Sequence, residues 1–545
     1  MALCLVKSAA TNSKEFVNGL VRHKEPWQIV AITATGTLVG VWMFEFIFDG
    51  DESAWARIKK SAFRLLRKIP AVRNKIDSEL QKIQVSFSED AKKRYQGKEF
   101  FYALPSKGQA DSEIMKQVHE YLELGEYQWK DGYLSGSLYM WNQKLIELLT
   151  EVCSAAFYTN PLHPDVFPGV NKMEAEVVRI SCNLFRGGPD SCGTMTTGGT
   201  ESIFMACKAY RDYARETKGT RRPEIIVPVT AHAAFDKAAH YLGIRIKHIP
   251  VNEDTTVNIA AMKRAISKNT CMLVGSAPNF PYGTIDDIKS IGELGLKYNI
   301  PVHVDACLGG FIAAFMDYTE YQMPPFDFRV PGVTSISADT HKYGFAPKGS
   351  SVVLYSEQKY RRFQYTVTTD WPGGVYGSPT VGGSRCGAII ATCWATFMHF
   401  GMEGYVEATR QIVKATKHIE NGLRKIDGIF VFGRPVTSVV AVGSKDFDIY
   451  RLQEAMQSKG WNLNTLQFPK GIHLCVTHLH TEEGRADAFL KDVREAVAVI
   501  MKNPQKEVEG SMAMYGASTT LQDRSIVTDF TRFWIDALYY TPDSA

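Results

Sequence analysis

Two lysines lie six residues apart in the segment SISADTHKYGFAPKGSS, residues 335–351. Lys342 follows the β-branched run SISAD within a few residues and has His341 beside it, and Lys348 comes later in the same segment. A lysine buried in a low-dielectric cleft tends to lose its proton and becomes a nucleophile toward carbonyl carbons. A solvated surface charge is the alternative for either lysine, and this segment alone does not decide between the two.

Two further polar residues follow predicted buried strands. Asp305 ends the run IPVHVD, where a carboxylate is costly unless it meets a cation; a helix cap is the simpler explanation. His232 follows the run EIIVPVT and could stack on a flat ligand or satisfy a hydrogen bond in the core. Because ligands of open α/β sheets bind at the carboxyl ends of strands, both residues are candidates for one site.

The segment TTGGTES, residues 196–202, is a glycine-rich turn at the start of a predicted helix. The backbone N–H groups around Gly199 and Thr200, together with the helix dipole, could hold a phosphate. The segment is neither G-x-G-x-x-G nor a Walker motif, so it does not indicate NAD or ATP. Simple turn formation is the alternative.

The four features together indicate more than each does alone. A phosphate cradle, a histidine able to cover an aromatic ring, a strand-end aspartate and a His-Lys pair are what pyridoxal 5'-phosphate requires. The cradle would hold its phosphate, His232 would cover its ring, and Asp305 would keep its ring nitrogen protonated. Lys342 would form the Schiff base, with His341 as a neighbouring catalytic and cofactor-binding residue. The sequence therefore predicts a pyridoxal phosphate site.

The elements that must position these residues are strands alternating with helices. After about residue 160, short β-branched runs alternate with helical stretches, which indicates an α/β fold with a mostly parallel sheet covered on both faces. We expect a helical and loop segment over 101–170, a large cofactor-binding domain over 171–400 and a smaller C-terminal α+β domain over 401–503. The tail over 504–545 is expected to wrap over the surface or over a partner subunit.

The composition is that of an ordinary folded protein. The chain has 545 residues, of which 45% are hydrophobic and 22% charged, enough for a core of more than one domain. The net charge of +4 is small, and nothing suggests nucleic-acid binding. The ten cysteines form neither a C-x-x-C pair nor a metal-ligand spacing, so we expect reduced thiols and no metal site.

An apolar run near the N-terminus predicts a membrane anchor. Residues 27–48 contain no Lys or Arg, and a helix of that length spans a bilayer core of about 30 Å; a buried helix or an uncleaved signal-like segment is the alternative. Eight basic residues follow the run between positions 57 and 75, in the first part of the linker over 49–100, and four precede it within residues 1–26. This asymmetry predicts a lumenal N-terminal segment and a cytosolic catalytic part.

The motifs TGGTESI, HVDACLGGF and HKYGFAPKGSS resemble those of the fold-type I pyridoxal phosphate enzymes, in the branch that holds the amino-acid decarboxylases. The closer resemblance, over roughly residues 100–500, is to the sphingosine-1-phosphate lyase family. It implies a single-pass protein of the endoplasmic reticulum membrane, active in sphingolipid degradation. Such an enzyme cleaves phosphorylated sphingoid bases by retro-aldol chemistry to a long-chain aldehyde and phosphoethanolamine. Phe345 is a departure, since many relatives would have tyrosine there.

The same resemblance implies further site residues and a homodimer with shared active sites. Substrate phosphate is expected at Lys348, with Tyr139, Asn160 and His163 around the same pocket. Gly382 and Ser384, in the loop YGSPTVGGSR over 376–385, are expected to contact the cofactor phosphate of a partner subunit, with plain flexibility as the alternative. An amino-acid decarboxylase of the same fold and a membrane-anchored scaffold without catalysis are the alternative functions.

Overall fold

The computed structural model describes residues 22–48, 54–508 and 524–542, together with Gly19, Met512, Tyr515, Gly516 and Thr519. Side chains at 44–48, 54–57, 60 and 64 lie outside this description. The chain divides into two compact units: one comprises Met1–Asp90 and Gln522–Tyr540, and the larger one comprises Ala91–Leu521 and Thr541–Ala545.

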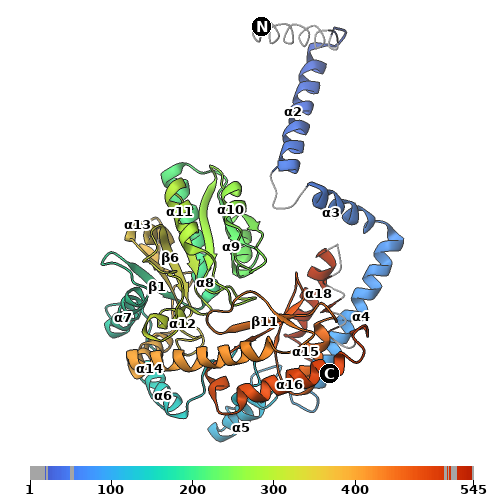
Figure 1. Ribbon diagram of the computed structural model, residues 1–545. Helices are drawn as coiled ribbons and strands as arrows, with labels where there is room; N and C mark the ends of the chain where they lie inside the picture. Colours follow the sequence, from blue (N-terminus) through green and yellow to red (C-terminus); the bar gives the residue numbers. More distant parts are fainter. Residues whose placement is uncertain are drawn as a thin grey trace. The chain divides into compact units, whose positions relative to one another are not determined.

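The larger unit contains a seven-stranded sheet (Figure 1). Its strands are β1 (Cys192–Thr196), β2 (Glu224–Pro228), β3 (Arg245–Ile249), β4 (Thr270–Ser276), β5 (Val302–Asp305), β6 (Val333–Ala338) and β7 (Ser351–Tyr355). They are ordered β1-β7-β6-β5-β4-β2-β3. Strand β7 is antiparallel to both of its neighbours, and the other pairs are parallel. The prediction of a mostly parallel α/β sheet is confirmed.

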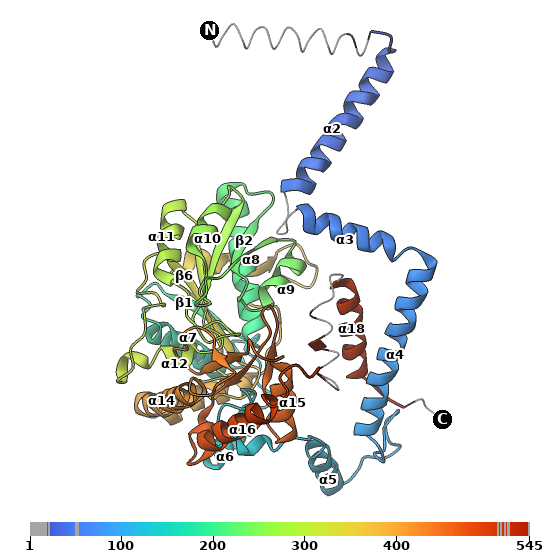
Figure 2. The ribbon, with the colours of Figure 1, turned by 45° about the vertical axis from the view of Figure 1, so that its right-hand side comes forward.

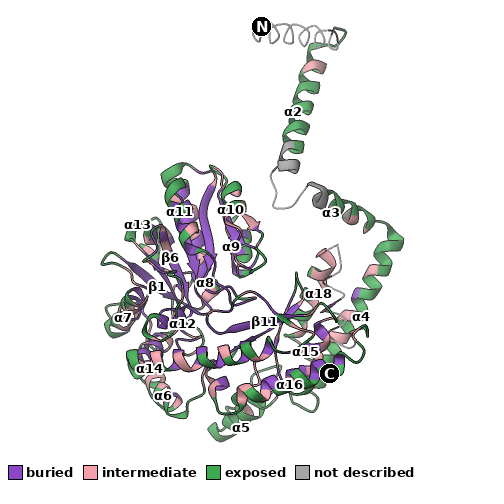
Figure 3. Cartoon of the chain, in the orientation of Figure 1, coloured by how far each residue is buried: buried purple, intermediate pink, exposed green. Residues whose placement is uncertain are grey.

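Helices cover both faces of this sheet because its strands are apolar on both sides. Val353 and Tyr355 of β7 belong to one buried cluster, with α8 (Gly199–Lys218) and α9 (Ala234–Leu242). Val352 and Leu354 of the same strand belong to a second cluster. That cluster includes α7 (Pro168–Leu184), α11 (Ile288–Tyr298), α12 (Gly310–Ala313) and α14 (Gly387–Leu423). Figure 3 shows the strands as buried purple segments between helices with green outer faces.

A second, four-stranded antiparallel sheet follows α14 in the chain. It is built from β10 (Phe430–Val431), β11 (Val439–Gly443), β12 (Asn464–Leu466) and β13 (Gly471–Cys475), with α15 (Tyr450–Ser458) and α16 (Arg485–Ile500). Figure 2 shows α15 and α16 side by side, and α6 (Gln143–Ala156) packs on α14. The remaining elements of this unit are α5 (Asp111–Leu122), α10 (Ile259–Ala265), α13 (Gln358–Arg361) and a hairpin of β8 (Thr366–Thr368) and β9 (Tyr376–Ser378).

The predicted apolar segment forms a helix, α2 (Pro26–Phe48). Within the part of the chain that the structure describes, however, no helix combines the length and the apolar character needed to cross a membrane. The helix is therefore as predicted, but the transmembrane span is not supported.

The smaller unit joins the two ends of the chain. It contains α3 (Ala54–Leu66), α4 (Pro70–Arg94) and, from the C-terminal tail, α18 (Arg524–Ala537). Nη2 of Arg67 lies 2.6 Å from Oδ2 of Asp529, and the rings of Phe87 and Phe530 meet edge to face with centroids 5.1 Å apart. The described C-terminal helix thus packs on a helix of its own chain.

Candidate active site

The candidate site lies where three neighbouring parallel strands end. Asp305, the last residue of β5, is in register with Ser276 of β4 and Ser337 of β6. Lys342 follows the end of β6 by four residues. The carboxyl ends of parallel strands meet at one edge of a sheet, so the topology brings Asp305 and Lys342 to the same edge, as predicted.

Lys342 forms an ion pair that the sequence analysis missed. Its Nζ lies 2.8 Å from Oδ2 of Asp339, and that carboxylate is buried. Burial is the largest single influence and lowers the pKa of Lys342, but the combined interactions with Asp339, Tyr139 and Cys307 raise it above its ordinary value. The expectation of a lysine deprotonated by burial is therefore wrong, because Asp339 favours the ammonium form.

Gly199, in the predicted phosphate cradle, begins α8 and must be glycine. A Cβ atom there would lie 2.8 Å from both carboxyl oxygens of Asp339 and 2.9 Å from Sγ of Cys307. The first N–H groups of a helix have no partner within the helix, and Gly199 and Thr200 occupy these positions in a helix of 20 residues. The cradle therefore offers free N–H groups and a helix dipole to an anion.

Asp305 is 6% exposed, and its two recorded hydrogen bonds end on the same carboxyl oxygen. Its Oδ1 accepts hydrogen bonds from the N–H of Cys307 at 3.0 Å and from the hydroxyl of Ser337 at 3.3 Å. Among the residues that the structure describes, none donates a hydrogen bond to Oδ2. A carboxylate with one oxygen fixed and the other available suits a protonated ring nitrogen.

The two predicted histidines differ in burial. Nδ1 of His341 lies 2.5 Å from the carbonyl oxygen of Ser350 and must donate to it, which leaves Nε2 of the neutral ring as an acceptor. Burial lowers the pKa of His341, which favours this neutral form. His232 is exposed, and its Nδ1 accepts the N–H of Ala234 at 3.1 Å at the start of α9. Its exposure leaves the ring able to cover a flat ligand, and a buried core role is excluded.

A cavity of about 220 Å³ adjoins Lys342 and His341. Lys348 shares this cavity, and its Nζ lies 4.8 Å from the ring centroid of the buried Tyr139. Burial, followed by the charge of Lys342, lowers the pKa of Lys348. Two neighbouring cations repel each other unless an anion lies between them, so the cavity suits a substrate phosphate. Its apolar wall includes Leu138, Met140, Leu145, Ile146, Leu149 and Phe345.

Asn160 and His163 lie elsewhere, outside the described lining of this cavity. The side-chain oxygen of Asn160 accepts the N–H of Leu162 at 3.1 Å and that of Arg385 at 3.2 Å. His163 is exposed, and its N–H donates to the carbonyl oxygen of Asn160 at 3.2 Å. Within one chain the structure therefore places these two residues beside the loop over 376–385, away from Tyr139 and Lys348.

That loop has a defined shape. The hydroxyl of Ser378 donates to the carbonyl oxygen of Gly382 at 2.8 Å, and the N–H of Val381 donates to Oε1 of Glu201, in the first turn of α8, at 2.9 Å. Ser384 is exposed. Plain flexibility is therefore a poor description of the segment that carries Gly382 and Ser384.

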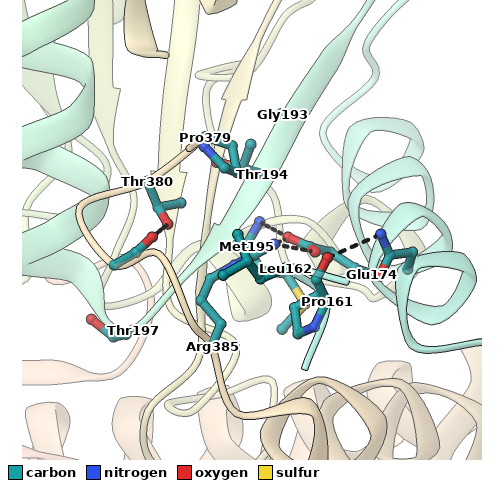
Figure 4. A network of polar contacts seen from close by, with 12 residues as sticks. Pro161, Leu162, Glu174, Gly193, Thr194, Met195, Thr197, Pro379, Thr380 and Arg385 are labelled. Carbon is teal, nitrogen blue, oxygen red and sulfur yellow. Dashed lines mark hydrogen bonds and ion pairs between the residues drawn. The ribbon is translucent and has the colours of Figure 1, made fainter. Parts of the chain in front are cut away.

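An ion pair between the loop and α7 is the second feature that the sequence analysis missed. Nη1 and Nη2 of Arg385 lie 2.5 and 2.9 Å from the two carboxyl oxygens of Glu174, and both side chains are largely buried (Figure 4). Oε1 of Glu174 also accepts the N–H of Met195 in β1 at 3.3 Å. This bidentate pair fixes the loop to the sheet just before the phosphate cradle. A glutamate in an amphipathic helix gives no signal of such a partner, whereas Asp339, three residues before Lys342, could have been considered.

The residues present fit pyridoxal phosphate. Among the residues that the structure describes, the buried Oδ1 of Asp339 has no hydrogen-bond partner, and Asp339 packs where a Cβ on Gly199 could not fit. Lys342 would hold the cofactor covalently, Gly199 and Thr200 its phosphate, and Asp305 its ring nitrogen. The group would supply an electron sink there.

Comparisons with known proteins agree with this geometry. Residues 95–442 match the family model described as the pyridoxal-dependent decarboxylase conserved domain. The chain is 57% identical over 529 residues to the sphingosine-1-phosphate lyase of Drosophila melanogaster, covering 97% of each chain. It is 50% identical over 538 residues to sphingosine-1-phosphate lyase 1 of Rattus norvegicus, covering 98% of this chain and 94% of that one.

Solved structures place the fold in the same group. The sphingosine-1-phosphate lyase of Burkholderia pseudomallei is 35% identical, with a TM-score of 0.76 over 82% of this chain and 99% of that one. A glutamate decarboxylase of Lactobacillus brevis, 20% identical with a TM-score of 0.64 over 76% of this chain and 97% of that one, shares the fold. The prediction of pyridoxal phosphate as cofactor is confirmed. The chain belongs to the pyridoxal-dependent decarboxylase family and, within it, to the sphingosine-1-phosphate lyases.

Proposed function

We propose that this protein cleaves phosphorylated sphingoid bases at the bond between the amino-bearing and hydroxyl-bearing carbons. The products are a long-chain aldehyde and phosphoethanolamine. The observation that carries the proposal is the second cation, Lys348, which shares a cavity of about 220 Å³ with Lys342 and contacts Tyr139. The lyase relatives support the same reaction class.

Each residue has a defined part in this reaction. When bound, pyridoxal phosphate takes up the electron pair released as the carbon–carbon bond breaks. Lys342 would hold the cofactor covalently, and its Nζ is placed where it could also carry protons. His341 offers an acceptor nitrogen, Nε2, 3.8 Å from Oδ2 of Asp339. Lys348 and Tyr139 bind the substrate phosphate.

The product of the reaction distinguishes this function from an amino-acid decarboxylase of the same fold. The test incubates the holoenzyme with a panel of phosphorylated long-chain bases and, separately, with aromatic and acidic amino acids. We expect aldehyde and phosphoethanolamine from the bases, no carbon dioxide from the amino acids, and no product with Lys342→Ala. Carbon dioxide without aldehyde would refute the proposal.

We also propose that the active enzyme is a homodimer in which the loop over 376–385 serves the partner's site. Exposed apolar side chains around the β8–β9 hairpin support this: Val367, Trp371, Val375 and Val381 are 64%, 56%, 79% and 66% exposed. Asn160 and His163, which lie beside this loop, would then join the partner's substrate site.

Complementation between two inactive variants tests the shared site. Lys342→Ala and Gly382→Val proteins are each expected to be inactive alone, because one lacks the covalent anchor and the other crowds the loop. Coexpression in one cell should restore roughly a quarter of the wild-type activity, since half of randomly paired dimers carry one intact site. Absence of any restored activity in dimers shown to be mixed would contradict the proposal.

We further propose that the protein works at the endoplasmic reticulum membrane, with its larger unit in the cytosol. Exposed apolar side chains in α2 support membrane contact, among them Trp27, Val30 and Leu38 at 68%, 68% and 71%. Deleting residues 1–50 should preserve turnover of detergent-dispersed substrate and lower turnover of substrate in vesicles. Equal losses with both substrates would instead indicate a role of the segment in folding.

A further inference from the structure

A buried histidine lies on the same strand as Asp305 and has no part in the reaction described so far. His303 of β5 is 0% exposed. Side chains two residues apart on a strand point to the same face, so His303 and Asp305 share one face of the sheet. The neighbouring strand β6 presents Ser335 and Ser337 in register with them.

The two serines satisfy both nitrogens of the histidine ring. Nδ1 of His303 lies 2.8 Å from Oγ of Ser335, and Nε2 lies 3.1 Å from Oγ of Ser337. The hydroxyl of Ser337 in turn donates a hydrogen bond to Oδ1 of Asp305, at 3.3 Å. A continuous hydrogen-bonded row therefore runs from Ser335 through His303 and Ser337 to the carboxylate at the strand end.

The chemistry of these groups fixes the direction of every proton in the row. An ionised carboxylate only accepts, so Ser337 must donate its proton to Asp305. The oxygen of Ser337 then accepts from Nε2–H of His303, and the bare Nδ1 of the neutral ring accepts from the hydroxyl of Ser335. The ring is neutral because burial lowers the pKa of His303 to about 4. This arrangement requires a single tautomer of the histidine.

We propose that His303 is a positioning residue for Asp305. Its Nε2–H orients the hydroxyl of Ser337, which holds Oδ1 of the carboxylate and leaves Oδ2 for the ring nitrogen of pyridoxal phosphate. A hydrogen bond to an ionised carboxylate stabilises its charged form. His303 thereby holds the carboxylate of Asp305, through Ser337, in the orientation in which Oδ2 would accept a hydrogen bond from the protonated ring nitrogen.

Solid-state ¹⁵N NMR of holoenzyme loaded with cofactor labelled at its ring nitrogen tests this directly. Ser337→Ala removes the hydroxyl that donates to Asp305, with almost no change in side-chain volume. His303→Leu removes the ring N–H that donates to Ser337. Both should move the ring-nitrogen resonance toward that of neutral pyridine. Both should also weaken cofactor binding about tenfold, which corresponds to loss of one charge-assisted hydrogen bond. Neither readout needs substrate, so both are independent of the proposed lyase reaction.

Ser335→Ala is the matched control, because it removes the other serine hydroxyl that is hydrogen-bonded to the His303 ring, and this hydroxyl does not contact Asp305. It should leave the resonance and the cofactor affinity nearly unchanged. His303→Gln should restore both readouts relative to His303→Leu, since its amide can donate to Ser337. The proposal is overturned if the ring-nitrogen resonance of Ser337→Ala equals that of the wild type, or if Ser335→Ala shifts it equally. Ser337→Ala keeps the test decisive should His303→Leu fail to fold.

Discussion

Asp339 shows how a neighbouring carboxylate can change the protonation of a buried lysine. Burial disfavours the ammonium form of Lys342, but the carboxylate 2.8 Å away, together with Tyr139 and Cys307, raises the pKa above its ordinary value. Covalent capture of the cofactor requires the neutral amine. The apoenzyme must therefore release a proton from this ion pair before Lys342 reacts, and Asp339 controls how readily that happens.

Replacing Asp339 by Asn should speed capture of the cofactor by the apoenzyme at neutral pH. Loss of the carboxylate lowers the pKa of Lys342, so a larger fraction is neutral, and the pH dependence of capture shifts to lower pH. The measurement is the growth rate of the visible absorption band after addition of pyridoxal phosphate. Asp317→Asn, which alters an exposed ion-pair network instead, should leave the rate unchanged. Slower capture at every pH would show that Asp339 assists binding in another way.

Replacing Lys348 by Ala should raise the KM for a phosphorylated sphingoid base by roughly 10- to 100-fold, the value of a hydrogen bond to a charged group. The kcat should change little, because the contact is made in the ground state and the transition state alike. Steady-state kinetics with aldehyde detection gives both constants. Lys359→Ala, in an exposed pair with Glu357, is the control. Loss of the cofactor band in Lys348→Ala would show that the roles of the two lysines had been exchanged.

At the scale of elements, the Arg385–Glu174 pair joins the glycine-rich loop to α7 and β1. The backbone of Arg385 also orients Asn160, so one residue connects two predicted binding loops. Breaking a buried pair leaves an uncompensated charge and costs more than the pair contributes. The loop geometry should therefore depend on both partners.

Glu174→Ala should lower stability by about 3 kcal/mol and raise the KM more than it lowers kcat. Chemical denaturation and steady-state kinetics provide the two readouts. The double exchange Glu174→Arg with Arg385→Glu should recover part of both losses if the pair acts through its charges. Arg410→Ala, which breaks an exposed pair with Glu320, should cost much less stability than Glu174→Ala. Equal effects of Glu174→Ala and Arg410→Ala would contradict the assigned role.

At the scale of the whole molecule, buried histidines make stability depend on pH. Burial lowers the pKa values of His303, His473 and His480 to about 4 each. In the unfolded chain these groups bind protons below about pH 6.5. Their contribution to stability is therefore complete above pH 6.5 and is lost as the pH falls toward 4. Asp286 acts in the opposite sense, because burial raises its pKa to about 7.

The free energy of unfolding of the apoenzyme should consequently fall between pH 6.5 and pH 5. The effect of the three histidines is opposed by that of one carboxyl group. The free energy of unfolding should therefore change by roughly 2–3 kcal/mol per pH unit. Urea unfolding followed by circular dichroism at pH 7, 6 and 5 measures it. His473→Asn should reduce the slope, since one titrating group is removed. Equal stability at pH 5 and pH 7 would rule out this origin.

The candidate site residues and the helix-covered sheet could be predicted because both depend on short stretches of sequence. Apolar runs of strand length predict a sheet buried on both faces, and the residues that end those runs must meet at one edge. Lys342, Asp305 and Gly199 were found in this way. For residues 27–48 the predicted helix forms, while no helix among the described residues combines the length and apolar character needed to cross a membrane.

What the sequence by itself determined is the set of reacting groups: a lysine, a strand-end aspartate and a glycine turn, in an order that fits pyridoxal phosphate. Only the tertiary structure decided their charge and orientation. Glu174 and Arg385 are 211 positions apart in the chain, and His303 reaches Ser337 only because β5 and β6 are paired in register. Such contacts depend on how strands and helices pack, and burial and neighbouring charges then set each protonation state.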